Sequence, residues 1–121
     1  MKKIISVVAT FFTAVALLFG VTACAPENTD MSTVTAVIDV RTPAEFAEGH
    51  LEGAINVDWQ GSTFADEIAK FDPAGTYVIY CRSGNRSGQA ISAMTEMGFT
   101  NLTNAGSVDE AASVTGLAIV R

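Results

Sequence analysis

The chain has few of the residues that bind metals or nucleic acids. Its 121 residues include one histidine, two cysteines and one tryptophan, and 7 basic side chains stand against 13 acidic ones. No Cys/His pair has the spacing of a metal site, so we expect no metal and no other cofactor. No polybasic run is present, and phosphate binding needs lysine or arginine in excess on some face. We therefore expect no nucleic-acid partner.

The first 23 residues differ sharply from the rest. Lys2 and Lys3 precede an uncharged run, residues 4–20, and the chain then turns polar, a layout typical of a secretory signal peptide. VTAC (21–24) also resembles the lipobox of bacterial lipoproteins, in which the signal is cut before a cysteine that carries the lipid. We expect residues 1–23 to be such a signal and Cys24 to be lipidated. The domain would then lie outside the cytoplasm, in the periplasm or on the outer cell surface, and touch the membrane only through this anchor.

Two other fates of this segment stay open. Ala23-Cys24-Ala25 fits an A-x-A cleavage site without lipid, and residues 4–23 are long enough to remain as an uncleaved transmembrane helix. All three fates place the domain outside the cytoplasm. With Cys24 lipidated or removed, the mature domain keeps one thiol, Cys81, and cannot form an intramolecular disulfide. That thiol is then either buried and inert or present for its reactivity.

The rest of the chain has an ordinary globular composition. Residues 24–121 carry 5 basic and 13 acidic side chains, a formal charge of −8. Residues 24–33 are polar and show no periodicity, which predicts a tether, with order beginning near Val34. Residues 34–121 are enough for one small domain, which we expect to be monomeric.

Strands and helices are predicted to alternate along residues 34–121. VTAVIDV (34–40), AINV (54–57), YVIY (77–80) and residues 99–103 predict strands. Helices are expected over 43–48, 62–71 and 87–97, with a further helical segment at 109–112, a turn at 50–53 and a packed tail at 117–120. Thr42 and Glu45 form a capping box around Pro43. The alternation predicts an α/β fold with a central, mostly parallel sheet flanked by helices.

The motif CRSGNRS (81–87) places a thiol at the carboxyl end of a buried strand, where α/β sheets place ligands. The backbone amides of residues 82–87 can turn inward as an anion-binding nest, and the helix N-terminus adds partial positive charge. The two arginines supply two of the five positive charges of residues 24–121. These groups favour a thiolate and a small anionic substrate. Cys81 is therefore predicted to be the nucleophile, and the predicted substrate-binding residues are Arg82, Ser83, Gly84, Asn85, Arg86 and Ser87.

Residues 37 to about 106 resemble the single-domain rhodaneses. VIDVRTPAEFAEGHLEGAINV resembles the first signature of that family, and YCRSGNRSGQAISAMTEMGFTNLTNAG resembles its active-site loop, helix and following strand. The resemblance implies a rhodanese-like fold and a sulfurtransferase. By this resemblance, the Cys81 thiolate takes sulfur from thiosulfate or a similar donor and becomes a persulfide. The persulfide then passes the sulfur to cyanide or a thiol. Cysteine phosphatases use Cys-x5-Arg, a loop sized for a tetrahedral phosphate. Cys81 and Arg86 are spaced Cys-x4-Arg, so this loop is smaller and the spacing disfavours a phosphatase.

Two other interpretations of the loop are open. Cys81 could be a buried, inert cysteine beside a surface arginine pair. The domain could also be a non-catalytic module that carries a persulfide or binds a partner. This second alternative is motivated by Ala105-Gly106-Ser107, where many rhodaneses have a Gly-Gly turn and a nearby tryptophan.

Four further polar residues are expected to stabilise the fold. His50 lies in the predicted turn, and a thiolate held by amides and arginines needs no imidazole base. Asp39, Arg41 and Glu45 are expected to form one ion network that fastens the first strand to its helix.

Three further side chains are apolar, and two of them are predicted to lie in the core. Trp59 either lines the mouth of the pocket or packs. Met94 and Met97 are spaced to face the core from one helix.

Overall fold

The computed structural model describes residues 28–121, so the predicted signal segment and Cys24 lie outside the described residues. The elements, in chain order, are η1 (Met31–Thr33), β1 (Ala36–Asp39), α1 (Pro43–Glu48), β2 (His50–Leu51), β3 (Ile55–Asn56), α2 (Phe64–Ile68), β4 (Thr76–Tyr80), α3 (Asn85–Glu96), β5 (Asn101–Gly106), α4 (Val108–Thr115) and β6 (Ile119–Val120). Within residues 28–121, no helix combines the length and apolar character needed to cross a membrane.

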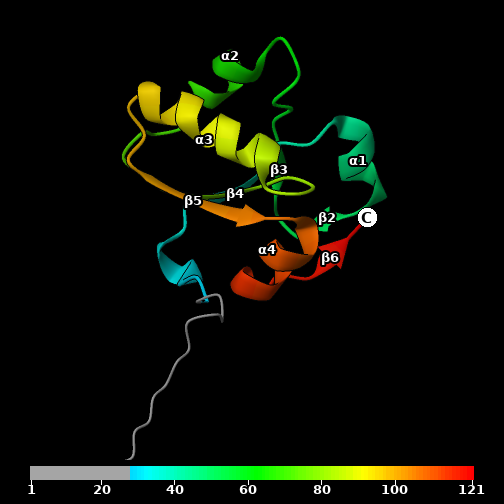
Figure 1. Cartoon of the computed structure of the whole chain (residues 1–121). Helices are drawn as coiled ribbons and strands as arrows, with labels where there is room; N and C mark the ends of the chain where they lie inside the picture. The colour runs from blue at the N-terminus through cyan, green and yellow to red at the C-terminus, as the bar shows by residue number, and fades with distance from the viewer. Residues whose placement is uncertain (1–27) are drawn as a thin grey trace, which may run out of the picture.

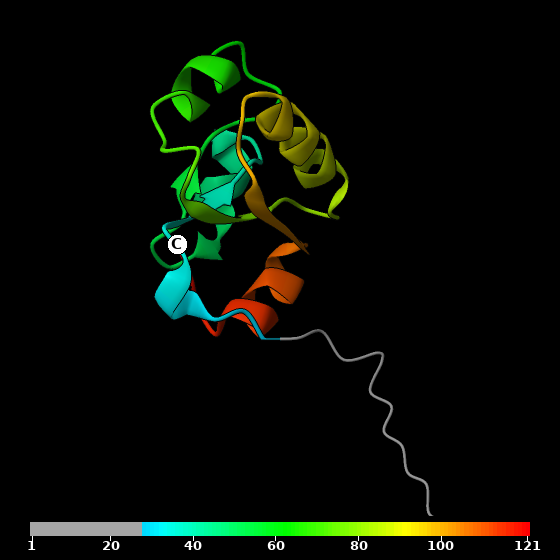
Figure 2. The same ribbon diagram turned by 90° about the vertical axis from the view of Figure 1, so that its left-hand side faces the viewer.

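Four strands form a parallel sheet in the order β3-β1-β4-β5. Figures 1 and 2 show α2 and α3 on one side of this sheet and α4 on the other. The predicted α/β fold with a central parallel sheet is confirmed.

Side chains along β4 alternate between the two faces of the sheet. Tyr77, Ile79 and Cys81 belong to the core packed under α2 and α3, and Val78 and Tyr80 belong to the core beside α4. The strand is an unbroken apolar run because both of its faces are covered. Cys81 therefore lies on the same side of the sheet as α3, the helix that begins just after it.

Several segments of the domain differ from prediction. Strand β5 runs from Asn101 to Gly106 instead of 99–103, and α2 is shorter than the predicted 62–71. Met31–Thr33 form a 3-10 helix capped by Asp30, and Met31 packs against the core beside α4, so the ordered chain begins before Val34. His50–Leu51, predicted as part of a turn, pair in antiparallel fashion with Ile119–Val120. The packing of Met31 and the pairing of His50–Leu51 both depend on contacts with residues distant in the sequence, which no local pattern reveals.

The helices begin where local chemistry predicted or close to it. Thr42 and Glu45 form the expected capping box of α1. Helix α3 begins at Asn85, two residues earlier than predicted. Met94 is fully buried, but Met97 is 36% exposed beyond the end of α3, so its predicted core position is wrong.

Asp39 and Arg41 form a buried ion pair at the end of β1. Both are at most 6% exposed, and Arg41 Nη2 lies 2.7 Å from Asp39 Oδ2. The same nitrogen donates to the carbonyl of Gly49 at 2.6 Å. The pair therefore ties the end of β1 to the end of α1, as predicted for these two residues. Glu45, the third member of the predicted network, makes its ion pairs elsewhere.

Replacing Arg41 by methionine should lower the free energy of unfolding by about 3 kcal/mol, because the Asp39 carboxylate would stay buried without its partner. Urea unfolding followed by circular dichroism measures this. Lys70→Met, at an exposed position, is the control and should change stability by less than about 0.5 kcal/mol. Equal stability of the two variants would show that the buried pair contributes nothing.

Candidate functional site

Cys81 lies directly after β4, at the carboxyl edge of the parallel sheet. Its N–H donates to the carbonyl of Gly106 at 2.9 Å, which continues the pairing between β4 and β5. The residue has no solvent-exposed surface. The thiol is thus held at the predicted position, the edge at which parallel sheets bind ligands.

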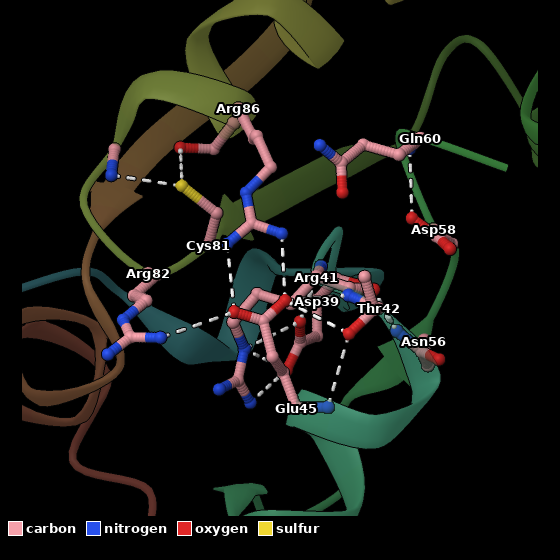
Figure 3. A network of polar contacts seen from close by, with 12 residues as sticks. Asp39, Arg41, Thr42, Glu45, Asn56, Asp58, Gln60, Cys81, Arg82 and Arg86 are labelled. Carbon is pink, nitrogen blue, oxygen red and sulfur yellow. Dashed lines mark hydrogen bonds and ion pairs between the residues drawn. The ribbon is translucent and has the colours of Figure 1, made fainter.

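The loop after Cys81 turns back on the sulfur. Gly84 has φ +95°, in the left-handed region that glycine adopts without a Cβ clash, and its N–H points at Cys81 Sγ at 2.9 Å. Ser87 Oγ, in the first turn of α3, lies 3.5 Å from the same sulfur. Figure 3 shows both contacts reaching the sulfur from the loop and the start of α3. One predicted loop amide, that of Gly84, and the side chain of Ser87 therefore face the sulfur.

The loop lowers the pKa of Cys81. Burial by itself raises the pKa of this thiol, but the Ser87 hydroxyl, when it turns toward a thiolate, and the backbone amides of Ser87, Ser83 and Gly84 outweigh burial and bring the pKa below its usual value. Hydrogen-bond donors stabilise a thiolate more than a thiol. The surroundings of the sulfur therefore favour its nucleophilic form.

The two arginines of the loop converge on Glu45 (Figure 3). Arg86 makes two hydrogen bonds to the Glu45 carboxylate, at 2.8 and 3.0 Å, and Arg82 lies 3.8 Å from it. Arg86 holds the pKa of Glu45 at about 2, so this carboxyl is ionised at neutral pH. The expected single network of Asp39, Arg41 and Glu45 is wrong in this respect, because Glu45 pairs with Arg86 and lies at the edge of ion-pair distance from the exposed Arg82 instead.

Asn104, on β5, is a site residue that sequence reasoning missed. Its Oδ1 accepts from the Ser87 hydroxyl at 2.7 Å and from the Gly106 N–H at 3.0 Å, and its Nδ2 donates to the Gly84 carbonyl at 3.0 Å. It lies 23 positions after Cys81 and is exposed, so no local pattern marks it. The pairing of β5 with β4 brings it to the loop.

Two hollows flank the loop. One, of about 260 Å³, has both signs of charge on its walls, from Arg82 and Arg41 on one hand and Glu45, Glu48 and Asp109 on the other. The other, of about 590 Å³, lies between Gly84, β5 and α4 and is bounded by Asn104 and Glu110. The walls of both hollows include residues of the loop, Ser83 and Gly84 in the larger and Arg82 in the smaller, but neither includes Cys81.

Several other predicted residues lie in simpler surroundings. Ser83 and Asn85 are exposed on the loop and at the start of α3. His50 Nδ1 lies 2.8 Å from the Phe46 carbonyl and its ring stacks on that of Phe46, a structural arrangement as expected. Trp59 packs edge-on against Phe64 and donates to Gln89.

Among residues 28–121, no group of three or more His, Cys, Asp or Glu side chains could hold a metal ion.

Comparison with known proteins agrees with this geometry. The thiosulfate sulfurtransferase PspE of Escherichia coli is 34% identical over 99 residues, which are 82% of this chain and 88% of that protein. The thiosulfate sulfurtransferase GlpE of Pseudomonas aeruginosa is 35% identical over 66 residues, or 54% of this chain and 58% of that one. A solved rhodanese with anions from Escherichia coli has 32% identity and a TM-score of 0.58, covering 71% of this chain and 96% of its own. The family model for the rhodanese-like domain matches residues 25–110, and the chain is therefore a member of the rhodanese-like domain family.

Proposed function

We propose that this protein is a sulfurtransferase of the thiosulfate type, with Cys81 as the residue that carries the sulfur. The observation that supports this most directly is the position of the thiol at the end of β4, 2.9 Å from the Gly84 N–H, with a pKa below its usual value. A thiolate and inward-facing amides are what attack on a small sulfur anion needs. PspE and GlpE, which the chain resembles, are named for this activity.

The proposed reaction has two steps. The Cys81 thiolate attacks the outer sulfur of thiosulfate, a new S–S bond forms, and the old S–S bond breaks with its electron pair leaving on sulfite. The product is a persulfide anion on Cys81, which the amides of the loop can stabilise. Cyanide or a thiolate then attacks the outer sulfur. Cyanide leaves as thiocyanate and a thiolate leaves as a new persulfide, and in both cases Cys81 returns to its thiolate form.

The donor must displace part of the loop to reach the sulfur. Cys81 has no exposed surface, and Glu45 holds both loop arginines from α1. An incoming dianion competes with the Glu45 carboxylate for the Arg86 guanidinium, because both are anions that this planar cation binds in a bidentate manner. We infer that opening of the Glu45–Arg86 pair accompanies donor binding.

Mass spectrometry after treatment with thiosulfate tests the proposed nucleophile. The purified protein should gain the mass of one sulfur atom on the peptide that contains Cys81, and cyanide should remove it. Cys81→Ala should gain none. A wild-type protein that gains no sulfur, or a Cys81→Ala variant that gains as much as the wild type, would contradict the proposal.

The second candidate is a non-catalytic module that carries a persulfide or binds a partner. The full burial of Cys81 and the neutralisation of Arg86 by Glu45 favour it, because both oppose rapid binding of an anionic donor. The two candidates differ in steady-state turnover. Sustained release of thiocyanate from thiosulfate and cyanide would exclude the module, whereas one round of loading without turnover would support it.

Charge changes at the Glu45–Arg86 pair should shift donor use in opposite directions. Glu45→Gln keeps the capping box but removes the competing charge, so the KM for thiosulfate should fall about threefold. Arg86→Ala removes the cation, and the KM should rise about tenfold. The measurement is thiocyanate release at varied thiosulfate concentration.

The matched controls for this pair are Glu96→Gln and Lys70→Ala, both at exposed positions. Neither should change the KM by more than about 1.5-fold, because screening weakens distant surface charges. If each control equals its partner variant in effect, only the overall charge of the protein matters and the proposed role of the pair is wrong.

We propose further that the protein is exported and held at a membrane by a lipid on Cys24. The lipobox-like VTAC and the apolar run before it support this. When the full chain is expressed in bacteria with labelled palmitate, the label should enter the wild-type protein and Cys81→Ser but not Cys24→Ser. A Cys24→Ser protein that stays in membranes at full length would indicate an uncleaved helix, and unlabelled, soluble wild-type protein would indicate simple secretion; either result would overturn the lipid anchor.

A further inference from the structure

The Ser87 hydroxyl has one proton and two neighbours that compete for it. Ser87 is fully buried, so its hydroxyl group needs a partner inside the protein. Asn104 Oδ1 lies 2.7 Å from Ser87 Oγ, and Cys81 Sγ lies 3.5 Å from the same oxygen. When the hydroxyl donates to Asn104, a lone pair of Ser87 Oγ faces the sulfur.

The orientation of the Asn104 amide is fixed by its other contacts. Oδ1 accepts from the Gly106 N–H and Nδ2 donates to the Gly84 carbonyl. A flipped amide would place its NH₂ against an N–H and its oxygen against a carbonyl, so the observed orientation is the stable one. Oδ1 can only accept, and Ser87 must be the donor in the contact between them.

The strand pairing explains why Asn104 reaches the loop. Ile79 pairs with Asn104, but Tyr80 pairs with Gly106, so the register shifts by one residue at Ala105. Such bulges redirect side chains and are frequent beside active sites. The irregularity leaves the Gly106 N–H available to Asn104 Oδ1 while the Gly106 carbonyl still accepts from Cys81.

We propose that Asn104 is a positioning residue of the sulfur site that draws the Ser87 hydroxyl proton away from Cys81 Sγ. The protonated thiol can then donate to Ser87 Oγ, and Ser87 must rotate toward the sulfur, leaving Asn104, before its hydroxyl can stabilise a thiolate. Asn104 therefore restrains formation of the reactive sulfur. This inference rests on the proposed role of Cys81 as the nucleophile.

Losing the contact between Asn104 and Gly84 should affect the thiol less than losing the contact between Asn104 and Ser87. The Gly84 carbonyl also accepts from the Gly88 N–H at 3.1 Å within α3, so it keeps a partner without Asn104. The Gly84 N–H contact to the sulfur depends on the loop and the start of α3. Removing Asn104 therefore acts mainly on the Ser87 proton.

Asn104→Leu leaves the charged groups around the sulfur and its loop unchanged, whereas Asn104→Asp adds a negative charge beside them. These groups are Arg86 on α3, Arg82 in the loop, Glu45 and Glu48 on α1, the Asp39–Arg41 pair at the end of β1, Asp58 after β3, and Asp109 and Glu110 on α4. A changed pH profile of the thiol in Asn104→Leu can therefore be traced to the Ser87 proton, while Asn104→Asp combines that effect with repulsion by its own charge.

Two variants should move the thiol in opposite directions. In Asn104→Leu the hydroxyl loses its acceptor on β5 and Cys81 Sγ remains its neighbour, so Cys81 should react with iodoacetamide about fivefold faster at a pH below its pKa, the effect of one ordinary hydrogen bond. Asn104→Asp keeps the acceptor and makes it anionic, so Cys81 should react more slowly than in the wild type at the same pH. Alkylation of the Cys81 peptide is followed by mass spectrometry across pH, with folding of each variant checked by thermal unfolding.

Two comparisons make the test specific. Asn101→Leu and Asn101→Asp, at an exposed position of the same strand, should leave the alkylation profile unchanged. In a Ser87→Ala background, Asn104→Leu should no longer change the rate. A slower rate in Asn104→Leu, no change in either Asn104 variant, or an unchanged effect of Asn104→Leu without Ser87 would overturn the inference.

Alkylation needs no sulfur donor, so this test is independent of the proposed activity. If thiosulfate fails to load Cys81 while the alkylation rates shift as expected, the proposed function is wrong and the role of Asn104 stands. If loading succeeds and the rates do not shift, the role of Asn104 alone is wrong.

Discussion

Burial of β4 on both faces is the constraint on which the rest of the structure depends. Tyr77 and Ile79 pack under α2 and α3, Val78 and Tyr80 pack beside α4, and β1 and β5 cover the two edges of the strand. A strand covered in this way cannot shift its register without exposing apolar side chains. The Cys81 thiol, one residue beyond its end, is therefore held in a fixed position relative to β5 and α3.

The site combines two opposing electrostatic arrangements. Near the sulfur, the backbone N–H groups of Gly84, Ser83 and Ser87 favour negative charge on Cys81. Farther out, Glu45 is ionised and neutralises the arginine that an anion would bind. The thiolate is thus stabilised by short-range hydrogen bonds, while the longer-range attraction for anions is reduced by an internal competitor. In a protein whose residues 24–121 already carry a formal charge of −8, that competitor offsets one of the two arginine charges beside the thiol.

Contacts made by the ends of the described chain complete the domain. Met31 packs against the core beside α4, and Ile119–Val120 pair with His50–Leu51. Leu51 is fully buried there, and its N–H donates to the Tyr80 hydroxyl. The segment after α1 is thereby attached to β4, the strand that carries Cys81. Arg41 also ties the end of α1 to β1, through the Gly49 carbonyl and Asp39, so the helix that supplies Glu45 is held against the sheet by two separate contacts.

The sequence by itself was sufficient for the features set by neighbouring residues. The capping box of Thr42 and Glu45, the apolar run of β4 and the loop from Cys81 to Ser87 are local patterns, because caps, strands and nests form from residues a few positions apart. Only the tertiary structure decided which distant groups meet. It paired Glu45 with Arg86 rather than Arg41 and, through the shifted register of β5, placed Asn104 against Ser87. Such pairings depend on register and packing between separate elements, and a single sequence contains no local signal for them.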